Sequence, residues 1–210
     1  EVWTGSLNYT VSGAYEDNNN LVHIRSVKVA ENYRIEFEEM YTDDLFGSDT
    51  RAATPNPSVT VDGLRVETYF SPDDGVAARL LELLQGAQES IYFLAFSFTS
   101  DDIAQAMRDR ANAGVTVSGV MEDAQVQSNQ GTEFDLFVQS GLDVRRDGNS
   151  GQMHHKVIVI DRSIVITGSY NFTASAEDRN DENLVILFSP EIAELYLAEF
   201  ERVFDAAQQP

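Results

Sequence analysis

From residue 64 onward, short apolar runs alternate with amphipathic segments along the chain. The apolar runs predict strands, and the run at 91–98 is apolar enough for a strand that is buried on both faces. The predicted strands cover 65–70, 91–98, 115–121, 157–160, 164–167 and 184–188. Apolar residues at helical spacing predict helices at 73–87, 100–113, 132–139 and 190–206, with Gly114 as one stop signal. This alternation indicates an α/β fold, namely an α/β/α layered sandwich with a mixed central sheet.

The opening segment repeats the end of that unit. The chain begins EVWTGSLN, and IVITGSYN follows at 164–171, an offset of 163 residues. At the same offset, 21–25 matches the last predicted strand and 27–41 matches the last helix. The segment 48–60 is rich in Pro, Ser, Thr and Ala without periodicity, which is typical of a linker. We therefore expect 1–47 to be the C-terminal remnant of a first repeat, 48–62 to be a linker and 63–210 to be a complete second repeat.

Composition limits the class of protein. With 210 residues, of which 42% are apolar, the chain can bury a substantial core, and no apolar run approaches the roughly 18 residues of a membrane span. We expect a soluble protein, and because the first residue is not Met, a mature or truncated chain. The absence of cysteine excludes disulfides and thiolate sites but leaves the compartment open, so that a secreted or periplasmic location stays compatible.

The net charge of −21 is distributed over the whole chain. Residues 1–62 contribute 4 basic minus 11 acidic groups, or −7, and the remainder contributes 10 minus 24, or −14. This predicts a heavily solvated acidic surface and argues against a broad nucleic-acid-binding face. Residues 144–162 are an exception, because Arg145, Arg146, Lys156 and Arg162 outnumber two aspartates and give a local +2. We expect this cationic island to surround a site for an anionic group.

The candidate chemistry lies in 153–183. The spacing is His154-x-Lys156-x4-Asp161, then Gly168-Ser169-x-Asn171, then Glu182. On a strand, residues i and i+2 share a face, so that His154 and Lys156 lie together. Imidazole is neutral near pH 7 and is both a nucleophile and a leaving group, which suits attack on a phosphodiester. Lys156, Ser169 and Asn171 offer a charge and hydrogen bonds to the phosphate oxygens, and Glu182 offers an acceptor that fixes the tautomer of His154.

Nearby polar residues have simpler interpretations. Parity places His155 and Asp161 on the face opposite His154, which favours a structural histidine and a turn residue that closes the strand. His23 lies in a strand-like segment and is expected to be structural. The spacing Asp178-x-Asn180-x-Glu182 lacks the glycine and the distal glutamate of a calcium loop, so that we expect no metal.

These motifs resemble those of the phospholipase D superfamily, also called HKD proteins, over 64–206 as a complete repeat and over 1–45 as the end of another. The resemblance implies that His154 is the nucleophile or its acid partner. It implies that Lys156 and Asn171, assisted by Ser169, bind phosphate and that Glu182 orients the histidine, while Asp161 and Gly168 complete the motif. It also implies a phosphohistidine intermediate, no metal or other cofactor, and two motifs that meet across a pseudo-twofold axis.

The chain departs from this pattern in its first repeat. The counterparts of His154 and Lys156 fall at positions −9 and −7, before Glu1. Ser6 and Asn8 are kept as phosphate-binding candidates, but Asn19 stands where the second repeat has Glu182. Either the missing His-x-Lys is upstream or a second chain lends it; the start of the chain within a strand favours the first. Alone, the fragment is expected to be inactive.

Three functions are compatible with the residues. The first is a phosphodiesterase that acts on phospholipid or other phosphodiesters, and an endonuclease with the same mechanism is the alternative within that class. The third is a non-catalytic phosphate-binding module. A purely structural domain would leave the convergence of His154, Lys156, Ser169 and Asn171 unexplained.

Overall fold

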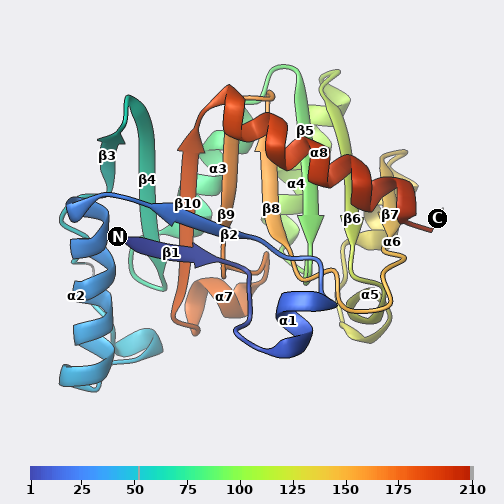
Figure 1. The fold of residues 1–210 in the computed structure, drawn as a ribbon. Helices are drawn as coiled ribbons and strands as arrows, with labels where there is room; N and C mark the ends of the chain where they lie inside the picture. Colours follow the sequence, from blue (N-terminus) through green and yellow to red (C-terminus); the bar gives the residue numbers. More distant parts are fainter. Residues whose placement is uncertain (52, 209–210) are drawn as a thin grey trace.

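The computed structural model describes residues 1–51 and 53–208, and its centre is a mixed sheet (Figure 1). Across the described residues this sheet has eight strands in the order β3-β4-β10-β9-β8-β5-β6-β7. The strands are β3 (Ser58–Val61), β4 (Leu64–Ser71), β5 (Ser90–Ala95), β6 (Thr116–Met121), β7 (Asp143–Arg146), β8 (Lys156–Ile160), β9 (Ile164–Gly168) and β10 (Glu182–Phe188). β5, β6 and β7 run parallel to one another, and every other neighbouring pair is antiparallel.

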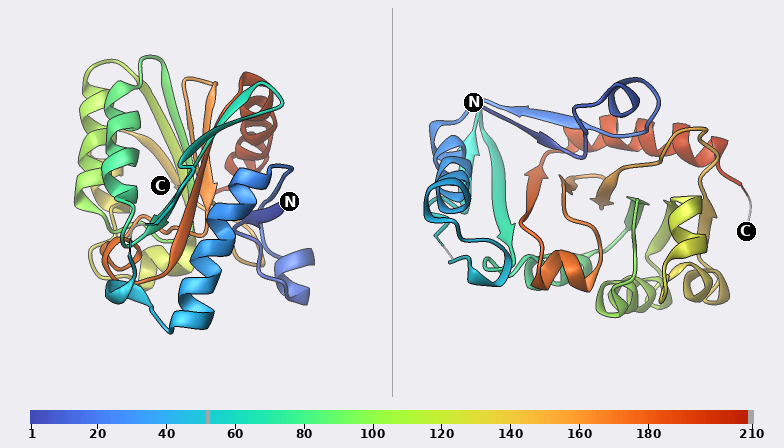
Figure 2. Two further views of the ribbon diagram at one scale, coloured as in Figure 1. Left: turned by 90° about the vertical axis from the view of Figure 1, so that its left-hand side faces the viewer. Right: turned by 90° about the horizontal axis from the view of Figure 1, so that it is seen from below.

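Helices cover both faces of the sheet, as seen end-on in Figure 2. One face carries α3 (Val76–Gly86), α4 (Asp101–Asn112), α5 (Asp123–Ser128), α6 (Phe134–Gln139) and α7 (Ala174–Asp178). The other face carries α8 (Pro190–Ala206) and the hairpin of β1 (Val2–Gly5) and β2 (Leu21–Ile24). The connection between β1 and β2 contains α1 (Val11–Tyr15), and α2 (Val27–Asp43) lies beside β4. Alternate residues of β8 supply the two cores, with Ile158 on the first side and Val157 on the second. The layered α/β fold with a mixed sheet is confirmed.

Most expected elements are confirmed, with differences at their ends. The strand expected over 91–98 ends at Ala95, after which Phe96 turns toward the start of β8 and its N–H bonds the carbonyl of His155. The helix expected from 73 begins at Val76, because Gly75 adopts a left-handed conformation that interrupts the helix. Four short elements (α1, α5, α7 and β7) were not anticipated, since their four to six residues show too little periodicity.

The expected linker is partly wrong. Gly47–Asp49 form a short 3-10 helix (η1), and Ser58–Val61 form β3, which pairs with β4 at the edge of the sheet. Val59 is buried in the second core, so that this part of the segment belongs to the domain. Residue 52 lies outside the described part of the chain.

The internal repeat is visible in the structure element by element. α1 and α7 occupy corresponding positions at the 163-residue offset, and so do the starts of α2 and α8. A serine caps each of the two long helices by accepting a helix N–H, namely Ser26 for α2 and Ser189 for α8. Gly5 and Gly168 also correspond, with φ of 151° and 145°. A Cβ on Gly168 would lie 2.1 Å from the carbonyl oxygen of Asn183, which explains why glycine is required there. The two segments therefore share local structure as well as sequence.

Asp161 closes β8 as the sequence predicts. It has a φ of 49°, and its carboxylate accepts the backbone N–H groups of Gln88, Glu89 and Ser90 at 2.7–3.1 Å. This carboxylate therefore ties the turn after β8 to the start of β5, at the end of β8 remote from His154. No helix among residues 1–51 and 53–208 combines the length and apolar character needed to span a bilayer.

Candidate active site

The site is built where the chain enters β8. The N–H of Met153 donates to the buried carboxyl of Glu122 at 2.7 Å, and the N–H of His154 donates to the carbonyl of Asn18 at 2.7 Å. On the other side, the carbonyl of His155 accepts the N–H of Phe96 at 2.8 Å. Three separate parts of the fold thus fix the backbone that presents His154 and Lys156.

His154 and Lys156 lie together on one face of β8, as strand parity predicts. The Nζ of Lys156 lies 3.1 Å from Nε2 of His154. The ring of Phe96 contacts both, with its centroid 4.6 Å from the imidazole centroid and 4.6 Å from Nζ. Only 4% of Lys156 is exposed, so that the amine and the imidazole share a largely desolvated environment.

The hydrogen bonds of His154 define its tautomer. Nδ1 lies 2.9 Å from the carbonyl oxygen of Ser6, an acceptor, so that Nδ1 carries the proton. Nε2 of the neutral ring then keeps its lone pair, which faces Lys156 and the space in front of it. Burial, followed by the nearby charge of Lys156, lowers the pKa of His154, which favours this neutral and nucleophilic form near pH 7.

Burial lowers the pKa of Lys156 to about 7, and the Glu182 carboxylate opposes that fall only in part. An ammonium in this position lacks a closely bonded anion and is costly to keep charged. An anion that docks against Nζ would reverse the shift, because an opposite charge favours the protonated amine.

The expected bond between Glu182 and His154 is wrong. The partner of Nδ1 is the Ser6 carbonyl, and the Glu182 carboxylate instead accepts the side-chain amide of Asn180 at 3.2 Å. Glu182 stands at the start of β10, separated from β8 by β9. A carbonyl oxygen is therefore the acceptor that fixes the tautomer, and no sequence motif signals it.

Ser169 and Asn171 occupy the turn after β9. The Ser169 oxygen accepts the N–H of Asn183 at 3.0 Å and its side-chain amide at 3.1 Å, which leaves the Ser169 hydroxyl proton free to donate. The Asn171 Oδ1 atom is buried without a hydrogen-bond partner among the described residues. Asn171 lines a cavity of about 390 Å³ together with Phe96, the residue whose ring contacts His154 and Lys156.

Ser6 and Asn8 show the same turn in the first segment. The Ser6 oxygen accepts the N–H of Asn20 at 3.1 Å, as Ser169 does for Asn183. The side chain of Asn8 is exposed, and its carbonyl accepts the N–H of Thr10 at 2.8 Å. The structure thus brings Ser6 to His154 through its main chain, and it places Asn8 at the surface.

His155 is a buried structural residue on the opposite face, as expected. Its Nε2 donates to Glu199 of α8 at 3.0 Å, and its Nδ1 accepts from the amide of Asn20 at 3.3 Å. Burial opposes ionisation of Glu199, yet hydrogen bonds from Arg202 and His155 lower the pKa of that carboxyl to about 2. His155 therefore links β8 to α8 and to the first segment.

The cationic island does not gather around the site, which corrects the expectation from the sequence. Arg145 bonds Asp143 and stacks on Phe204 of α8, with 3.6 Å between the guanidinium carbon and the ring centroid. Arg146 pairs with Asp123, and Arg162 pairs with Glu194. Each arginine is held by an acidic partner outside 144–162, on the same strand for Arg145 and on neighbouring helices for Arg146 and Arg162, so that Lys156 alone of the four stands beside His154.

The two segments exchange hydrogen bonds reciprocally. Thr4 donates to Oδ1 of Asn183 at 2.7 Å, and its counterpart Thr167 donates to Oδ1 of Asn20 at 3.0 Å. The asparagine pair and the threonine pair are each related by the 163-residue offset. The geometry is that of a local pseudo-twofold axis between the β1–β2 hairpin and the β9–β10 pair.

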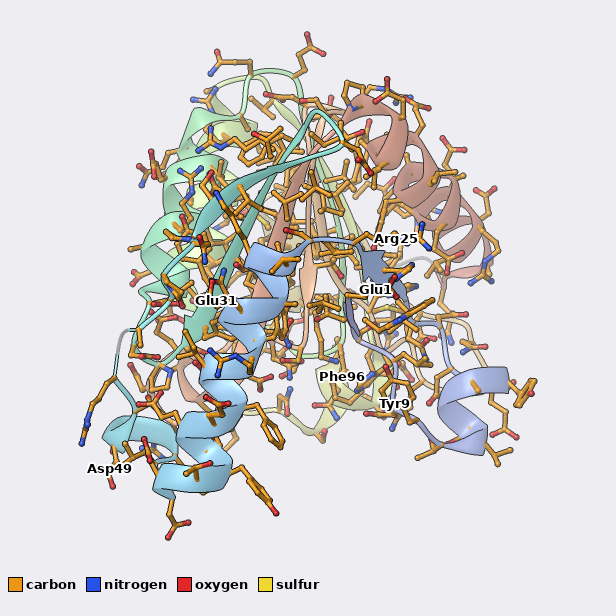
Figure 3. The ribbon with its side chains drawn as sticks, turned by 60° about the vertical axis from the view of Figure 1, so that its left-hand side comes forward. Glu1, Tyr9, Arg25, Glu31, Asp49 and Phe96 are labelled. Carbon is orange, nitrogen blue, oxygen red and sulfur yellow. The ribbon has the colours of Figure 1, made fainter. Side chains whose placement is uncertain are left out.

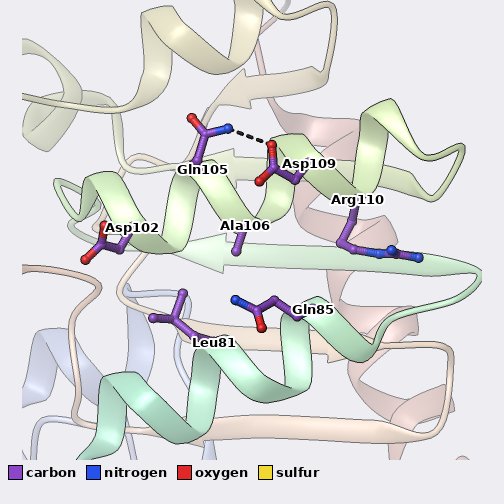
Figure 4. A pocket seen from close by; sticks show the side chains of 7 residues that line it. All are labelled: Leu81, Gln85, Asp102, Gln105, Ala106, Asp109 and Arg110. Carbon is purple, nitrogen blue, oxygen red and sulfur yellow. Dashed lines mark hydrogen bonds between the residues drawn. The ribbon is translucent and has the colours of Figure 1, made fainter.

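Another cavity, of about 390 Å³, lies between α3 and α4, where Gln105 donates to Asp109 at 2.7 Å (Figure 4). None of its lining residues belongs to the candidate set. It takes no part in the site.

Comparisons with known proteins identify what the chain as a whole is similar to. Residues 80–204 match a family model described as "Cardiolipin synthase, PLD-like domain". The chain is 31% identical to a phospholipase D of Rickettsia bellii, over 75% of this chain and 81% of that protein. It is 35% identical to the mitochondrial cardiolipin hydrolase of Mus musculus, over 61% of this chain but only 58% of that protein. The crystal structure of Nuc from Salmonella typhimurium, a phospholipase D family member, matches with a TM-score of 0.65 and 30% identity, over 69% of this chain and 97% of that one.

Proposed function

The chain belongs to the phospholipase D-like family, with relatives named phospholipase D and cardiolipin hydrolase, and we propose that it hydrolyses a phosphodiester through His154. The observation that carries this proposal is the hydrogen bond from Nδ1 of His154 to the Ser6 carbonyl. It leaves Nε2 as an unprotonated nucleophile, 3.1 Å from a lysine amine that suits a phosphate oxygen.

The reaction proceeds in two displacements. Nε2 of His154 attacks phosphorus, the bond to the leaving alkoxide breaks, and a second histidine donates a proton to that alkoxide. The deprotonated second histidine then takes a proton from water as the water oxygen attacks phosphorus, and the P–N bond breaks to regenerate His154. The intermediate is a phosphohistidine, and no metal or other cofactor takes part in these steps.

Lys156, Asn171 and Ser169 hold the phosphate during both steps. A dianionic, trigonal-bipyramidal transition state carries more charge on its oxygens than the substrate does, so that a desolvated Lys156 stabilises it preferentially. The Asn171 amide and the Ser169 hydroxyl donate to the same oxygens, and Ser6 and Asn8 have the corresponding role for the first repeat.

Glu182 serves the second motif in this proposal. The carbonyl of Asn18, in a loop of the first segment, accepts the backbone N–H of His154 in the second repeat. Asn18 corresponds to Asp181 at the 163-residue offset. By the pseudo-twofold relation, the loop that contains Asp181 and Glu182 would therefore bond the backbone of the missing His-x-Lys. Residues 1–47 would then be the C-terminal part of a first repeat and 63–210 a complete one, and the second motif comes from an upstream segment or from another chain.

The substrate class is a phosphodiester, and we favour a phospholipid. Several relatives are named cardiolipin hydrolase or phospholipase D, and the net charge of −21 opposes nonspecific binding of nucleic acid. An endonuclease is the second candidate, because the similarity to Nuc covers 97% of the Nuc chain and 69% of this chain.

The test uses the protein with both motifs present, assayed in parallel on phosphatidylcholine vesicles, cardiolipin vesicles and single-stranded DNA. His154→Ala should abolish turnover while circular dichroism shows an intact fold. Wild-type turnover in that variant would refute the mechanism. Saturable vanadate binding without turnover on any of the three would instead indicate a phosphate-binding module.

A further inference from the structure

Several exposed aromatic residues of the first segment correspond to buried residues of the second. Trp3, Tyr9 and Phe37 are 57%, 78% and 56% exposed, whereas their counterparts Ile166, Phe172 and Phe200 are at most 5% exposed. Phe37 stacks on Tyr41 at 5.3 Å between ring centroids, much as Phe200 stacks on Phe204 at 5.1 Å. Glu1 and Arg25 form an ion pair at the end of the hairpin formed by β1 and β2 (Figure 3). The first segment therefore has large apolar side chains exposed to solvent at positions where the second repeat buries them.

One edge of β1 is open. Its counterpart β9 pairs on both sides, with β10 and with β8, in an antiparallel register that sets Ile160 against Ile164. Within the described residues, β1 pairs with β2 alone. An unpaired strand edge exposes N–H and C=O groups that can take another strand.

A cavity of about 280 Å³ lies between α2 and the start of β10. Glu36, Glu182, Asn183 and Tyr33 line it, and Tyr33 donates to Thr4 of β1 at 3.2 Å. Glu36 and Asn183 are the counterparts of Glu199 and Asn20, the two residues that hold the ring of His155. The cavity thus carries the two groups that, elsewhere in this chain, bind a buried histidine.

Glu36 differs from Glu199 in lacking such a partner. Its Oε1 atom is buried with no hydrogen-bond partner among the described residues. Burial, then the charges of Asp73 and Glu39, raises the pKa of Glu36 to about 7, whereas hydrogen bonds bring that of Glu199 to about 2. A half-buried carboxyl in this condition is suited to accept an N–H donor.

We infer that Glu36 and Asn183 form a receptor for the imidazole of a histidine on a strand that adds to the open edge of β1. This inference rests on the proposed function and deepens it. The strand is a His-His-Lys segment equivalent to 152–161. Its second histidine binds Glu36 and Asn183, which places the first histidine beside Glu182 and the carbonyl of Ser169. A folded second copy cannot lend this strand, because its own β8 is paired on both sides, with β5 and β9. The occupant is therefore the corresponding part of a preceding half repeat.

The test adds a synthetic peptide with the sequence of residues 151–161 (GQMHHKVIVID) to this chain. Trp3 is the chain's single tryptophan and the peptide has neither tryptophan nor tyrosine, so that Trp3 fluorescence reports strand addition at β1. We expect a saturable change. Glu36→Gln should weaken binding at least about tenfold, as expected for losing a charge-assisted hydrogen bond. Glu38→Gln, on the exposed side of the same helix, should leave binding unchanged.

A peptide with phenylalanine in place of its second histidine should bind the wild-type chain about tenfold more weakly than the original peptide does. The Glu36→Gln variant should bind the two peptides equally. A second arrangement fuses residues 151–163 directly before Glu1, where the repeat places them, and measures thermal unfolding. The fusion should raise the midpoint, and the phenylalanine version should not. Equal binding by wild type and Glu36→Gln, or no binding together with no stabilisation by the fusion, overturns the inference. His154→Ala abolishes turnover without altering peptide binding, so that failure of the proposed function is seen separately.

Discussion

The burial of Lys156 makes a prediction that can be measured without any substrate. Its pKa of about 7 in the folded chain compares with about 10.4 in an unfolded chain. Between these values the unfolded chain retains a proton that the folded chain has lost, so that folding becomes more favourable as pH rises. At 1.36 kcal/mol per pKa unit, and because the folded group is still half protonated at pH 7, this group should raise the free energy of unfolding by about 2.3 kcal/mol from pH 7 to pH 9.

The comparison is between wild type and Lys156→Met. Methionine keeps most of the apolar stem and removes the titrating amine, so that the difference in unfolding free energy between the two proteins should grow with pH by that amount. Chemical denaturation at pH 7, 8 and 9 measures it. The other lysine of the chain, Lys28, is exposed, and Lys28→Met is the matched control that should show no such slope.

The pKa itself can be observed directly. With only two lysines, a sample labelled with ¹³C at the lysine ε-carbons gives two side-chain signals, one of which should titrate near 7. Vanadate or phosphate should shift that midpoint upward, because an anion against Nζ favours the ammonium. A Lys156 signal that titrates above 10, or a midpoint that vanadate leaves unchanged, would refute the desolvated phosphate site.

Three further predictions concern groups that support the site. Glu199→Gln leaves the buried ring of His155 with a weaker acceptor and should cost about 1–3 kcal/mol of unfolding free energy, measured by urea denaturation; no loss would contradict the role given to this bond. Asp161→Ala removes the acceptor of three backbone N–H groups and should lower stability by a similar ~1–3 kcal/mol, whereas Asp161→Asn should retain part of it. Gly168→Ala introduces a Cβ 2.1 Å from a carbonyl oxygen at a φ of 145°, so that loss of the fold, or a shift of the Ser169 turn seen by NMR, is expected; an unperturbed spectrum would show that the turn tolerates a side chain.

The sequence predicted the layered fold well because its strands and helices carry strong periodicity. α8 was predicted to its end residues, since a serine cap and a proline mark its start. The elements that escaped prediction are short and gain their stability from neighbours: β7 depends on β6, and the 3-10 helix at Gly47 depends on a bond to Asp181.

In the site, local spacing was informative and long-range electrostatics was not. Strand parity placed His154 beside Lys156 and His155 on the far face, and both positions are confirmed. The Ser6 carbonyl could not be found, because a backbone acceptor has no side-chain signature. For Glu199, which binds His155, the sequence offered only the internal repeat as a signal, because Glu36 stands at the corresponding position. The arginines were misplaced because the net charge of residues 144–162 ignores acidic partners that lie outside that segment.

The hydrogen bonds from Thr4 to Asn183 and from Thr167 to Asn20 join the β1–β2 hairpin to the β9–β10 pair, so that each stabilises the other. Asn183 holds the turn of Ser169, yet its own side chain is anchored by Thr4 from the far end of the chain. Cutting the backbone within 48–57 would therefore not by itself release the phosphate turn. Removing the hairpin would take Thr4 from the Asn183 side chain, and the effect would appear at Ser169, to which that side chain donates.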